Sequence, residues 1–230
     1  MASAVTSTLL LRFAAPQQSW GSTELADRNT EAVPTRSGVI GMLAAALGAP
    51  RGSWPEWLWA TELWTRVDRK GELATDFHTV GIPSAGAQAV RTRHRAAVGG
   101  RGEADFIIPL GSGAKWTVGG GTLVTNRQYL ADAEFLVAIG HADTERVNEL
   151  AQATHNPVFM TYLGRKSFSP SFPFHLGVRD SDPRQVLTTL PTHTRSERGL
   201  TLHQLLGDRN YATETVHPPV SDTLTAWATS

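Results

Sequence analysis

The chain has 230 residues, enough for one large domain or two small ones with a substantial core. Lysine plus arginine equal aspartate plus glutamate at 21 each, so no overall positive charge indicates a nucleic-acid partner and any basic surface must be local. The absence of cysteine excludes disulfides, cysteine-ligated zinc and thiol nucleophiles, and is consistent with a reducing cytoplasm.

The apolar runs of the sequence are too short for a membrane helix. The longest, residues 39–47, is about half of the roughly 20 residues that a span requires. The N-terminal stretch MASAVTSTLLLRFAAP has no basic residue before its short apolar run, which argues against a secretory signal and favours a first strand. We therefore expect a soluble, cytoplasmic protein without a membrane partner.

The first predicted elements are a strand and a helix. Residues 9–14 alternate between two sets of side chains, as they do in a strand, and Pro16 ends the pattern. Apolar residues recur at helical spacing over residues 39–47, where Gly48 and Pro50 supply a stop signal.

A short helix and two strands come next. The stretch SWPE has the spacing of a capping box and predicts the start of a short helix. Residues 63–68 alternate as a strand that runs toward a turn at Gly71, and residues 72–80 return from that turn.

A glycine-rich segment interrupts the core pattern. Residues 81–121 hold ten glycines and little apolar periodicity, which predicts a long, flexible hairpin outside the core. Arg91, Arg93 and Arg95 alternate within it, so in a hairpin all three would point to one face, where they could neutralise phosphates. A solvated surface is the other interpretation of the same charges.

The core pattern resumes in the second half. The continuously apolar run at residues 135–139 predicts a central strand buried on both faces. Asp143 then caps a helix that Pro157 closes, and residues 158–164 form a last predicted strand. The resulting order is strand, helix, strand, hairpin insertion, strand, helix, strand. This order matches the split βαβ pattern of ferredoxin-like and RNA-recognition-motif folds, so the predicted class is α+β.

These elements suggest a division into two parts. We expect residues 1–175 to form one ferredoxin-like domain with an insertion at about 81–121. Residues 176–230 are predicted to form a small C-terminal subdomain. That subdomain contains one short helix candidate, DPRQVLTTL, and strand-like pieces such as YATETV.

Two features in the first forty residues are candidates for RNA binding. The N–H groups around Thr35, Arg36 and Ser37 begin the predicted helix, where the helix dipole favours a phosphate. The glycines that follow also permit close packing of that helix on the sheet. Trp20, with nearby Arg28, is either a base-stacking residue beside a backbone clamp or a partly buried core aromatic.

Further basic and aromatic residues flank the predicted strands of the second half. NRQY stands at the entry to the central strand, and YLGRKSF reaches past the end of the last predicted strand. Basic groups beside aromatic rings are typical of an RNA-facing edge, although basic turns after strands are common. The candidates are Arg127, Gln128, Tyr129, Arg165 and Lys166.

One constellation of residue types is compatible with catalysis. His78, Tyr129 and Lys166 could supply the base, the acid and the cation of a metal-independent ribonuclease. The sequence has eight histidines, so a chance position for His78 is the simpler interpretation. HExxH, GxSxG and spaced acidic metal ligands are absent from the sequence, and we expect no metal or other cofactor.

The chain resembles the CasD family, which is the type I-E form of the fifth Cas family, over nearly its whole length. The stretches that carry the resemblance are LLLRFAAPQQSWG at 9–21, PTRSGVIGMLAAALG at 34–48, RVDRKG with DFHTVG between 66 and 81, NRQYLADAEFLVAI at 126–139 and YLGRKSF at 162–168.

The resemblance implies a subunit of the CRISPR surveillance complex Cascade. It implies a modified RNA-recognition-motif domain with a protruding thumb hairpin, which is what residues 81–121 resemble. It also implies binding to the 5′ handle of the CRISPR RNA, capping of the filament of backbone subunits, and a place beside the large subunit that reads the PAM. Target DNA is then an indirect partner.

The family's RNA contacts are carried over only to residues inside the matching stretches. The residues expected near the handle are Trp20, Arg28, Arg36, Arg127, Gln128, Tyr129, Arg165 and Lys166. The roles of Arg91, Arg93 and Arg95 rest on the charge argument alone.

Two alternatives to a handle-binding subunit stay open. Type I-C relatives cleave the precursor RNA themselves, whereas the SWG and YLGRKSF stretches look like the type I-E form, which only binds. A purely structural adaptor that touches RNA incidentally is the third possibility.

Overall fold

A computed structural model describes residues 7–21, 27–80, 107–109, 115–117 and 123–221 of the chain. The chain divides into two compact units. Unit 1 comprises Met1–Gly21, Thr30–Leu73 and Tyr129–Ser230, and unit 2 comprises Ser22–Asn29 and Ala74–Gln128.

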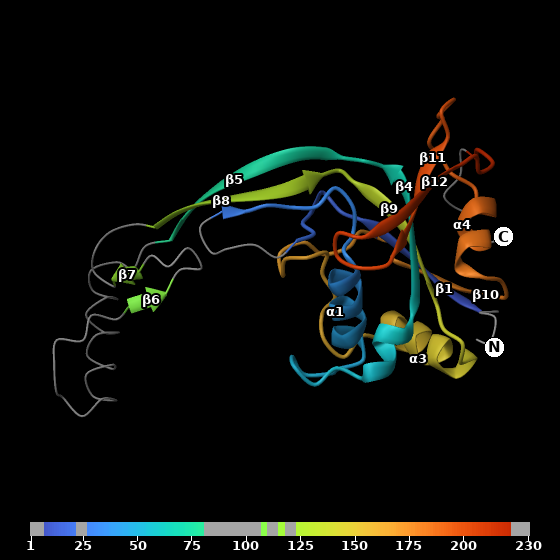
Figure 1. Ribbon diagram of the computed structural model, residues 1–230, viewed down its shortest axis with the longest axis horizontal. Helices are drawn as coiled ribbons and strands as arrows, with labels where there is room; N and C mark the ends of the chain where they lie inside the picture. Colours follow the sequence, from blue (N-terminus) through green and yellow to red (C-terminus); the bar gives the residue numbers. More distant parts are fainter. Residues whose placement is uncertain (1–6, 22–26, 81–106, 110–114, 118–122, 222–230) are drawn as a thin grey trace. The chain divides into compact units, whose positions relative to one another are not determined.

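Unit 1 is built on a six-stranded sheet in the order β10-β1-β9-β4-β11-β12. Every pair of neighbouring strands in it is antiparallel. Its strands, labelled in Figure 1, are β1 (Thr8–Ala14), β4 (Glu62–Arg69), β9 (Glu134–Gly140), β10 (His175–Arg179), β11 (Leu200–Leu205) and β12 (Tyr211–Val216).

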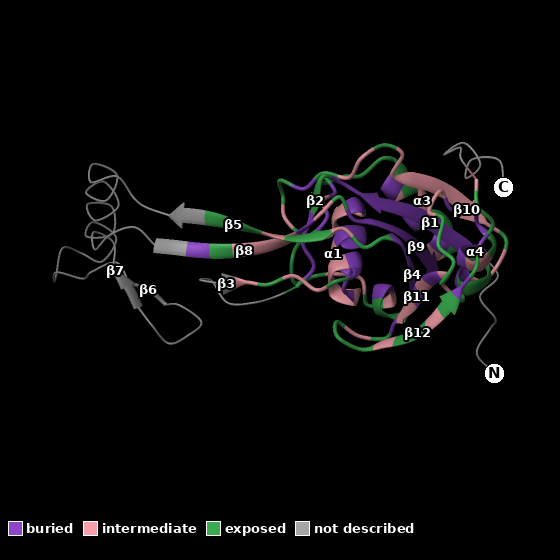
Figure 2. Ribbon diagram, turned by 90° about the horizontal axis from the view of Figure 1, so that it is seen from above, coloured by how far each residue is buried: buried purple, intermediate pink, exposed green. Residues whose placement is uncertain are grey.

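Helices cover both faces of this sheet. Its helical elements are α1 (Arg36–Ala46), the 3₁₀ helix η1 (Glu56–Ala60), α3 (Thr144–His155) and α4 (Pro183–Thr189). One core cluster joins alternate residues of β1 and β9 to α1 and α3, and a second joins the intervening residues to α4. All residues of β1 and β9 are therefore buried, as Figure 2 shows in purple.

The structure confirms most of the predicted elements of unit 1 and the α+β class. The predicted strand at 9–14 is β1, the predicted helix at 39–47 is α1, and the run at 135–139 lies in β9. Asp143 caps α3, because its side chain accepts a hydrogen bond from the backbone N–H of Glu145. The short helix after SWPE is η1, but its N-cap is Pro55 and no side chain caps it, so the predicted capping box is wrong.

The predicted last strand at residues 158–164 is wrong. The backbone N–H groups of Val158 and Phe159 instead donate to the carbonyls of Ala46 and Ala45, 3.0 and 3.2 Å away, at the end of α1. The bond from Val158 satisfies the Ala46 carbonyl at the helix end, and the Ala45 carbonyl accepts from Gly48 N–H as well as from Phe159. The strand beside β1 is β10, which comes later in the chain.

The chain turns at Gly71 as predicted, but the strands before and after this turn do not pair with each other as a hairpin. Gly71 has φ +71°, which suits glycine. The following strand, β5 (Glu72–Val80), pairs with β8 (Leu123–Ala131) instead of with β4. Both edges of β4 are already occupied, by β9 and β11.

The segment after residue 175 extends the sheet of unit 1, in contrast to the predicted separate subdomain. The DPRQVLTTL stretch forms α4 and YATETV forms β12, as predicted. Leu187 of α4 and Leu202 of β11 are fully buried in the same cluster as Leu10 of β1. The C-terminal elements thus complete the second face of the core.

Unit 2 contains the middle of the chain. In its sheet, β8 pairs with β5 and with β3 (Asp27–Arg28), which runs parallel to it. Two short strands, β6 (Ile107–Pro109) and β7 (Lys115–Thr117), pair antiparallel within the predicted hairpin. Arg91, Arg93 and Arg95 lie outside the described residues.

One more short strand, β2 (Gln17–Gln18), belongs to unit 1 and pairs with Ala131 and Leu130 at the end of β8. Among the residues that the structure describes, none of the helices has the length and apolar character needed to cross a membrane.

A fully buried arginine joins β4 to the end of α4. The Arg66 guanidinium forms a bidentate ion pair with Asp68, with Nε–Oδ1 and Nη2–Oδ2 distances of 2.7 and 2.9 Å. It also donates to the carbonyls of Leu187 and Leu190 at the C-terminus of α4. Removing one member of such a pair leaves an uncompensated buried charge, which costs more than the pair contributes.

We predict that Asp68→Asn lowers the free energy of unfolding by about 3–5 kcal/mol, because it strands the Arg66 charge in the core. Chemical denaturation of the two proteins measures this difference. The matched control is Glu149→Gln, which breaks the exposed 2.7 Å ion pair with Arg146 and should cost no more than about 0.5 kcal/mol. Equal effects of the two substitutions would contradict the prediction.

Candidate nucleic-acid interface

Two arginines from distant parts of the sequence lie side by side in unit 2. Arg28 of β3 is the register partner of Arg127 of β8. Residues paired across neighbouring strands project from the same face of the sheet, about 5 Å apart at the backbone. The Nε atoms of both are buried without a hydrogen-bond partner, and neither guanidinium has an ion-pair partner among the described residues.

This arginine pair carries two adjacent positive charges without a compensating carboxylate in the described part of unit 2. Like charges opposite one another on a sheet destabilise it by a few tenths to about 1 kcal/mol. An anion that contacts both guanidinium groups would remove this repulsion, and a phosphate matches their planar geometry. The predicted candidates Arg28 and Arg127 are therefore brought together, and Gln128 follows directly on β8.

A second set of predicted candidates meets in unit 1. The ring of Tyr129 lies 6.2 Å from that of Phe168, tilted by 55°. The guanidinium of Arg165 lies over the Phe168 ring, with Cζ 5.5 Å from the ring centroid. Lys166 stands exposed in the same loop. Phe168 is itself buried, at 7% exposed, so the groups that this cluster offers to single-stranded RNA are the half-buried Tyr129 ring and the two cations.

The loop that carries Arg165 and Lys166 is held at both ends. Leu163 and Phe168 are joined by a 2.8 Å hydrogen bond from N–H to carbonyl, and Phe168 donates to the carbonyl of Arg165 at 2.9 Å. The backbone N–H of Ser19 donates to Leu163 at 3.1 Å. The sequence YLGRKSF therefore forms a compact turn fixed against the segment that follows β1.

The N-terminus of α1 already holds an anion of the protein itself. The Asp208 carboxylate accepts hydrogen bonds from the backbone N–H and the hydroxyl of Ser37, both at 2.7 Å. Arg36 donates to the carbonyls of Leu205, Trp59 and Thr61. Burial lowers the pKa of the Arg36 guanidinium, and the Asp208 charge opposes this shift. These contacts occupy the Ser37 N–H and the Arg36 guanidinium, two of the groups that were predicted to hold a phosphate.

Trp20 is a core residue in this structure, which corrects its interpretation as a base-stacking residue. Its side chain is 1% exposed, and its ring stacks on Phe13 of β1 with centroids 5.5 Å apart. Its Nε1 donates to Gln18 Oε1. A Cβ on Gly38 would lie 3.0 Å from the Trp20 ring, so this glycine permits the close approach of α1.

Other predicted site residues fall outside the described part of the chain. The three arginines of the glycine-rich segment, Arg91, Arg93 and Arg95, are among them. The backbone of His78 lies in β5, while its side chain is not described, so the constellation with Tyr129 and Lys166 stays a hypothesis. Within the described residues, no group of three histidine or acidic side chains is positioned to hold a metal ion.

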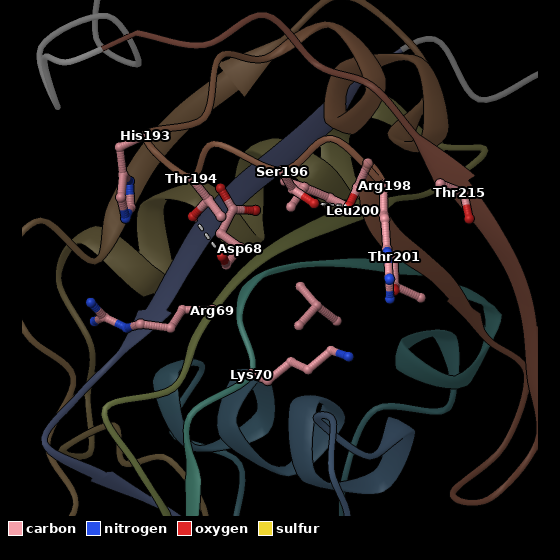
Figure 3. Close-up of a pocket in the computed structure, with 12 residues that line it drawn as sticks. Asp68, Arg69, Lys70, His193, Thr194, Ser196, Arg198, Leu200, Thr201 and Thr215 are labelled. Carbon is pink, nitrogen blue, oxygen red and sulfur yellow. Dashed lines mark hydrogen bonds between the residues drawn. The ribbon is translucent and has the colours of Figure 1, made fainter.

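A basic cavity that was not predicted lies in unit 1, between the end of β4 and the start of β11. Its volume is about 530 Å³. Val67 and Leu200 contribute buried apolar surface to it. Four groups with basic nitrogen line it, shown as sticks in Figure 3: Arg69, Lys70, His193 and Arg198.

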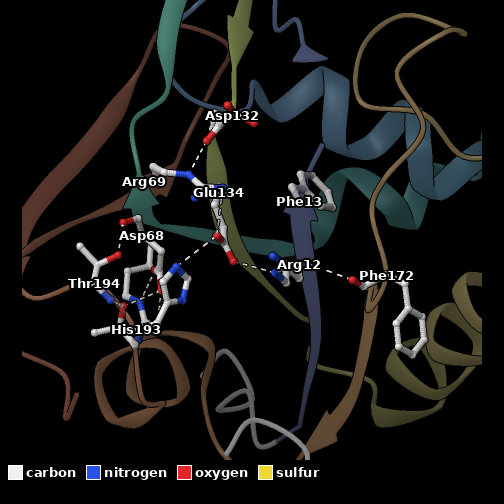
Figure 4. A network of polar contacts seen from close by, with 12 residues as sticks. Arg12, Phe13, Asp68, Arg69, Asp132, Glu134, Phe172, His193 and Thr194 are labelled. Carbon is white, nitrogen blue, oxygen red and sulfur yellow. Dashed lines mark hydrogen bonds and ion pairs between the residues drawn. The ribbon is translucent and has the colours of Figure 1, made fainter. Parts of the chain in front are cut away.

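A buried carboxylate holds one side of this cavity. Glu134, at the start of β9, is 1% exposed and pairs with Arg12 Nε at 2.6 Å. Its other oxygen lies 3.6 Å from Arg69 Nη2 and 3.4 Å from His193 Nε2. Figure 4 shows these side chains converging on Glu134 from β1, from the end of β4 and from the loop before β11.

One short sequence motif contains part of the cavity lining. The stretch RVDRKG contains Arg69 and Lys70 and carries the family resemblance, but sequence reasoning gave these residues no role. The opposite side of the cavity is formed by residues that come more than a hundred positions later in the sequence, among them His193 and Arg198. The antiparallel pairing of β4 with β11 brings the two parts together.

Comparisons with known proteins identify relatives over most of the chain. The model of the family described as CRISPR-associated protein (Cas_Cas5) matches residues 8–224. The chain is 33% identical over 188 residues to the CRISPR system Cascade subunit CasD of Escherichia coli (strain K12), which covers 79% of this chain and 75% of that protein.

Two solved structures have a similar fold. A chain of a CRISPR RNA-guided surveillance complex superposes with a TM-score of 0.68 and 30% identity, covering 96% of this chain and 98% of its own length. A crystal structure described as a Cas protein superposes with a TM-score of 0.63 and 27% identity, covering 94% of this chain and 100% of its own.

We predict that Trp20→Ala acts on folding and not on RNA contacts. Deleting a buried aromatic ring should lower the free energy of unfolding by about 3–5 kcal/mol, measured by chemical denaturation. Trp20→Phe keeps a stacked ring and should lose less than half as much stability. A Trp20→Phe protein that stays folded but binds RNA more weakly would contradict the core assignment.

Proposed function

The chain belongs to the Cas5 family of CRISPR-associated proteins, and from this we propose that it is the CasD-type subunit of a type I-E CRISPR surveillance complex. In this proposal it binds the 5′ handle of the CRISPR RNA without cleaving it. It caps the filament of backbone subunits beside the large PAM-reading subunit, and target DNA is an indirect partner.

The arginine pair of unit 2 is the observation that carries RNA binding. Arg28 and Arg127 are register partners whose charges have no compensating carboxylate among the described residues. Guanidinium groups in this arrangement suit the phosphodiester backbone of an RNA strand. A folded protein retains such a repulsive pair at a cost, which an RNA phosphate offsets when it binds.

The loop with Arg165 and Lys166 supports a second contact with single-stranded RNA. Tyr129 provides a half-buried aromatic ring, and the Arg165 guanidinium lies over the buried Phe168 ring that Tyr129 contacts. Aromatic rings stack on unpaired bases of any sequence, and neighbouring cations hold the backbone. This combination fits a short unpaired handle better than it fits a double helix, whose bases are not free to stack on side chains.

We also infer that the first four strands of the sheet and two of its helices form a modified RNA-recognition-motif unit of ferredoxin-like topology. The elements β1, α1, β4, β9, α3 and β10 follow one another in the order strand, helix, strand, strand, helix, strand. The corresponding strand order β10-β1-β9-β4 supports this topology. Strands β11 and β12 then extend the unit at the β4 edge.

The test of the arginine pair is binding of repeat-derived RNA in EDTA, with an intact handle, a scrambled handle and an uncut precursor. We predict that Arg28→Gln and Arg127→Gln each weaken binding of the intact handle about 3- to 30-fold, because each removes a charge-assisted hydrogen bond to RNA. Without RNA, each should leave the unfolding free energy within about 0.5 kcal/mol of the parent or raise it, because repulsion is relieved.

The matched control is Arg51→Gln, which removes an exposed arginine that has no hydrogen-bond or ion-pair partner among the described residues. Unchanged binding by both pair variants, or equal binding of intact and scrambled handles by the parent protein, would contradict handle recognition and favour a structural adaptor. Discrete cleavage upstream of the handle would instead make this protein a processing nuclease, with His78, Tyr129 and Lys166 as its first candidates.

A separate prediction concerns the arginine row at Arg91, Arg93 and Arg95. Replacing all three with alanine should weaken RNA binding and reduce the dependence of log K on log salt, by about 0.7 for each phosphate that the variant no longer neutralises. Anisotropy titrations of labelled RNA at several salt concentrations measure this slope. An unchanged slope would mean that these charges form only a solvated surface.

A further inference from the structure

We infer that the basic cavity between β4 and β11 is a binding site for the phosphodiester backbone of a nucleic-acid strand, with Lys70 and Arg198 as its anion-binding cations. This inference deepens the proposed function and rests on it only for the identity of the bound nucleic acid. The site lies in unit 1 and shares no residue with the arginine pair of unit 2.

The first argument is the balance of charge in the cavity. Lys70 and Arg198 extend toward one another across it in Figure 3, and neither has a hydrogen-bond or ion-pair partner among the described residues. The acidic lining residue, Asp68, is already paired with Arg66 and accepts a hydrogen bond from Thr192. Two converging cations therefore remain without an anion of the protein's own.

The second argument is that both cations stand in fixed backbone positions. Lys70 is followed by Gly71 and Arg198 by Gly199, and both glycines have positive φ, of 71° and 75°. The turn that carries Arg198 is closed on both sides, because Gly199 N–H donates to the Ser196 carbonyl and Ser196 Oγ donates to the Gly199 carbonyl. A fixed backbone removes the ordering of the main chain from the cost of binding, so that only the two exposed side chains remain to be ordered.

The Lys70 side of the cavity is fixed by the residue before it. Arg69 donates through Nε to the carbonyl of Asp132 and lies beside the buried Glu134 carboxylate. Its charge is therefore partly balanced by Glu134, whereas that of Lys70 is not. Arg69 and His193 thus define the wall of the cavity, and the unbalanced charge available to a ligand comes from Lys70 and Arg198.

The third argument is the chemistry of the remaining lining. Thr201 and Thr215 contribute hydroxyl groups from β11 and β12. Buried Val67 and Leu200 add an apolar surface. A phosphodiester linkage needs cations and hydroxyl donors for its oxygens, and the attached sugar offers apolar carbon to such a surface. A volume of about 530 Å³ exceeds what a single inorganic anion would fill.

The experiment measures binding of the full chain to single-stranded 12-nucleotide RNA and DNA of the same sequence, by anisotropy at several salt concentrations. We expect Lys70→Gln and Arg198→Gln each to weaken binding of the oligonucleotide about 3- to 10-fold and to lower the salt slope by about 0.7. Arg51→Gln is the control and should change neither quantity. Equal losses for RNA and DNA identify the phosphodiester backbone, and a loss confined to RNA adds a contact to the 2′-hydroxyl; both support the site.

Three results would overturn the inference. One is unchanged affinity and slope for both polymers in the double variant Lys70→Gln/Arg198→Gln. Another is a loss that Arg51→Gln reproduces. A third is a response of the parent protein's melting temperature to inorganic phosphate at constant ionic strength, abolished in the double variant, with unchanged oligonucleotide binding, because it would identify a small-anion site.

The same measurements separate this inference from the proposed function. If intact and scrambled handles bind equally to the parent protein, handle recognition fails. The cavity site still stands if Lys70→Gln and Arg198→Gln lower the salt slope for both RNAs. Conversely, if Arg28→Gln removes the preference for the intact handle while the cavity variants change nothing, the proposed function stands and the cavity site fails.

Discussion

The buried carboxylate of Glu134 is the constraint on which much of unit 1 depends. A lone carboxylate in this position would be strongly unfavourable, and so would the Arg12 guanidinium that β1 places in the sheet interior. Their 2.6 Å pair balances both charges. Because the other oxygen of Glu134 faces Arg69 and His193, the same carboxylate also fixes the end of β4 and the loop before β11. One carboxylate therefore balances a charge on β1 and also lies behind one wall of the basic cavity.

Burial of the central strands on both faces determines where chemistry can occur in unit 1. Every residue of β1 and β9 is covered by α1 and α3 on one face and by α4 on the other. Polar groups that meet a ligand are then confined to turns and strand ends, such as the turn with Lys70 and the loop with Arg165. Unit 2 differs, because its strands β3 and β8 themselves present Arg28 and Arg127. The candidate RNA-binding residues therefore belong to two kinds of surface, loops in unit 1 and a sheet in unit 2.

Local sequence patterns predicted most helices and strands of unit 1, because apolar periodicity and the Asp143 cap depend on residues that are close together in the sequence. Tertiary contacts decided the rest. Residues 158–164 have the composition of a strand, yet their N–H groups satisfy carbonyls of α1. The pairing of Arg28 with Arg127 joins positions far apart in the sequence, so each could be named as a candidate but their adjacency could not be predicted. The same holds for the cavity, whose Arg198 side no local motif marks.

The pairing of β5 with β8 has a consequence for how this chain can vary. The two strands are adjacent in the sheet, so the segment between them, residues 81–122, leaves and re-enters at neighbouring positions. The entropy of closing a loop between neighbouring strands rises only slowly with its length. Insertions and deletions in this segment therefore change the free energy of folding only slightly. An engineer can therefore place a reporter or an affinity module at this site without redesigning the core.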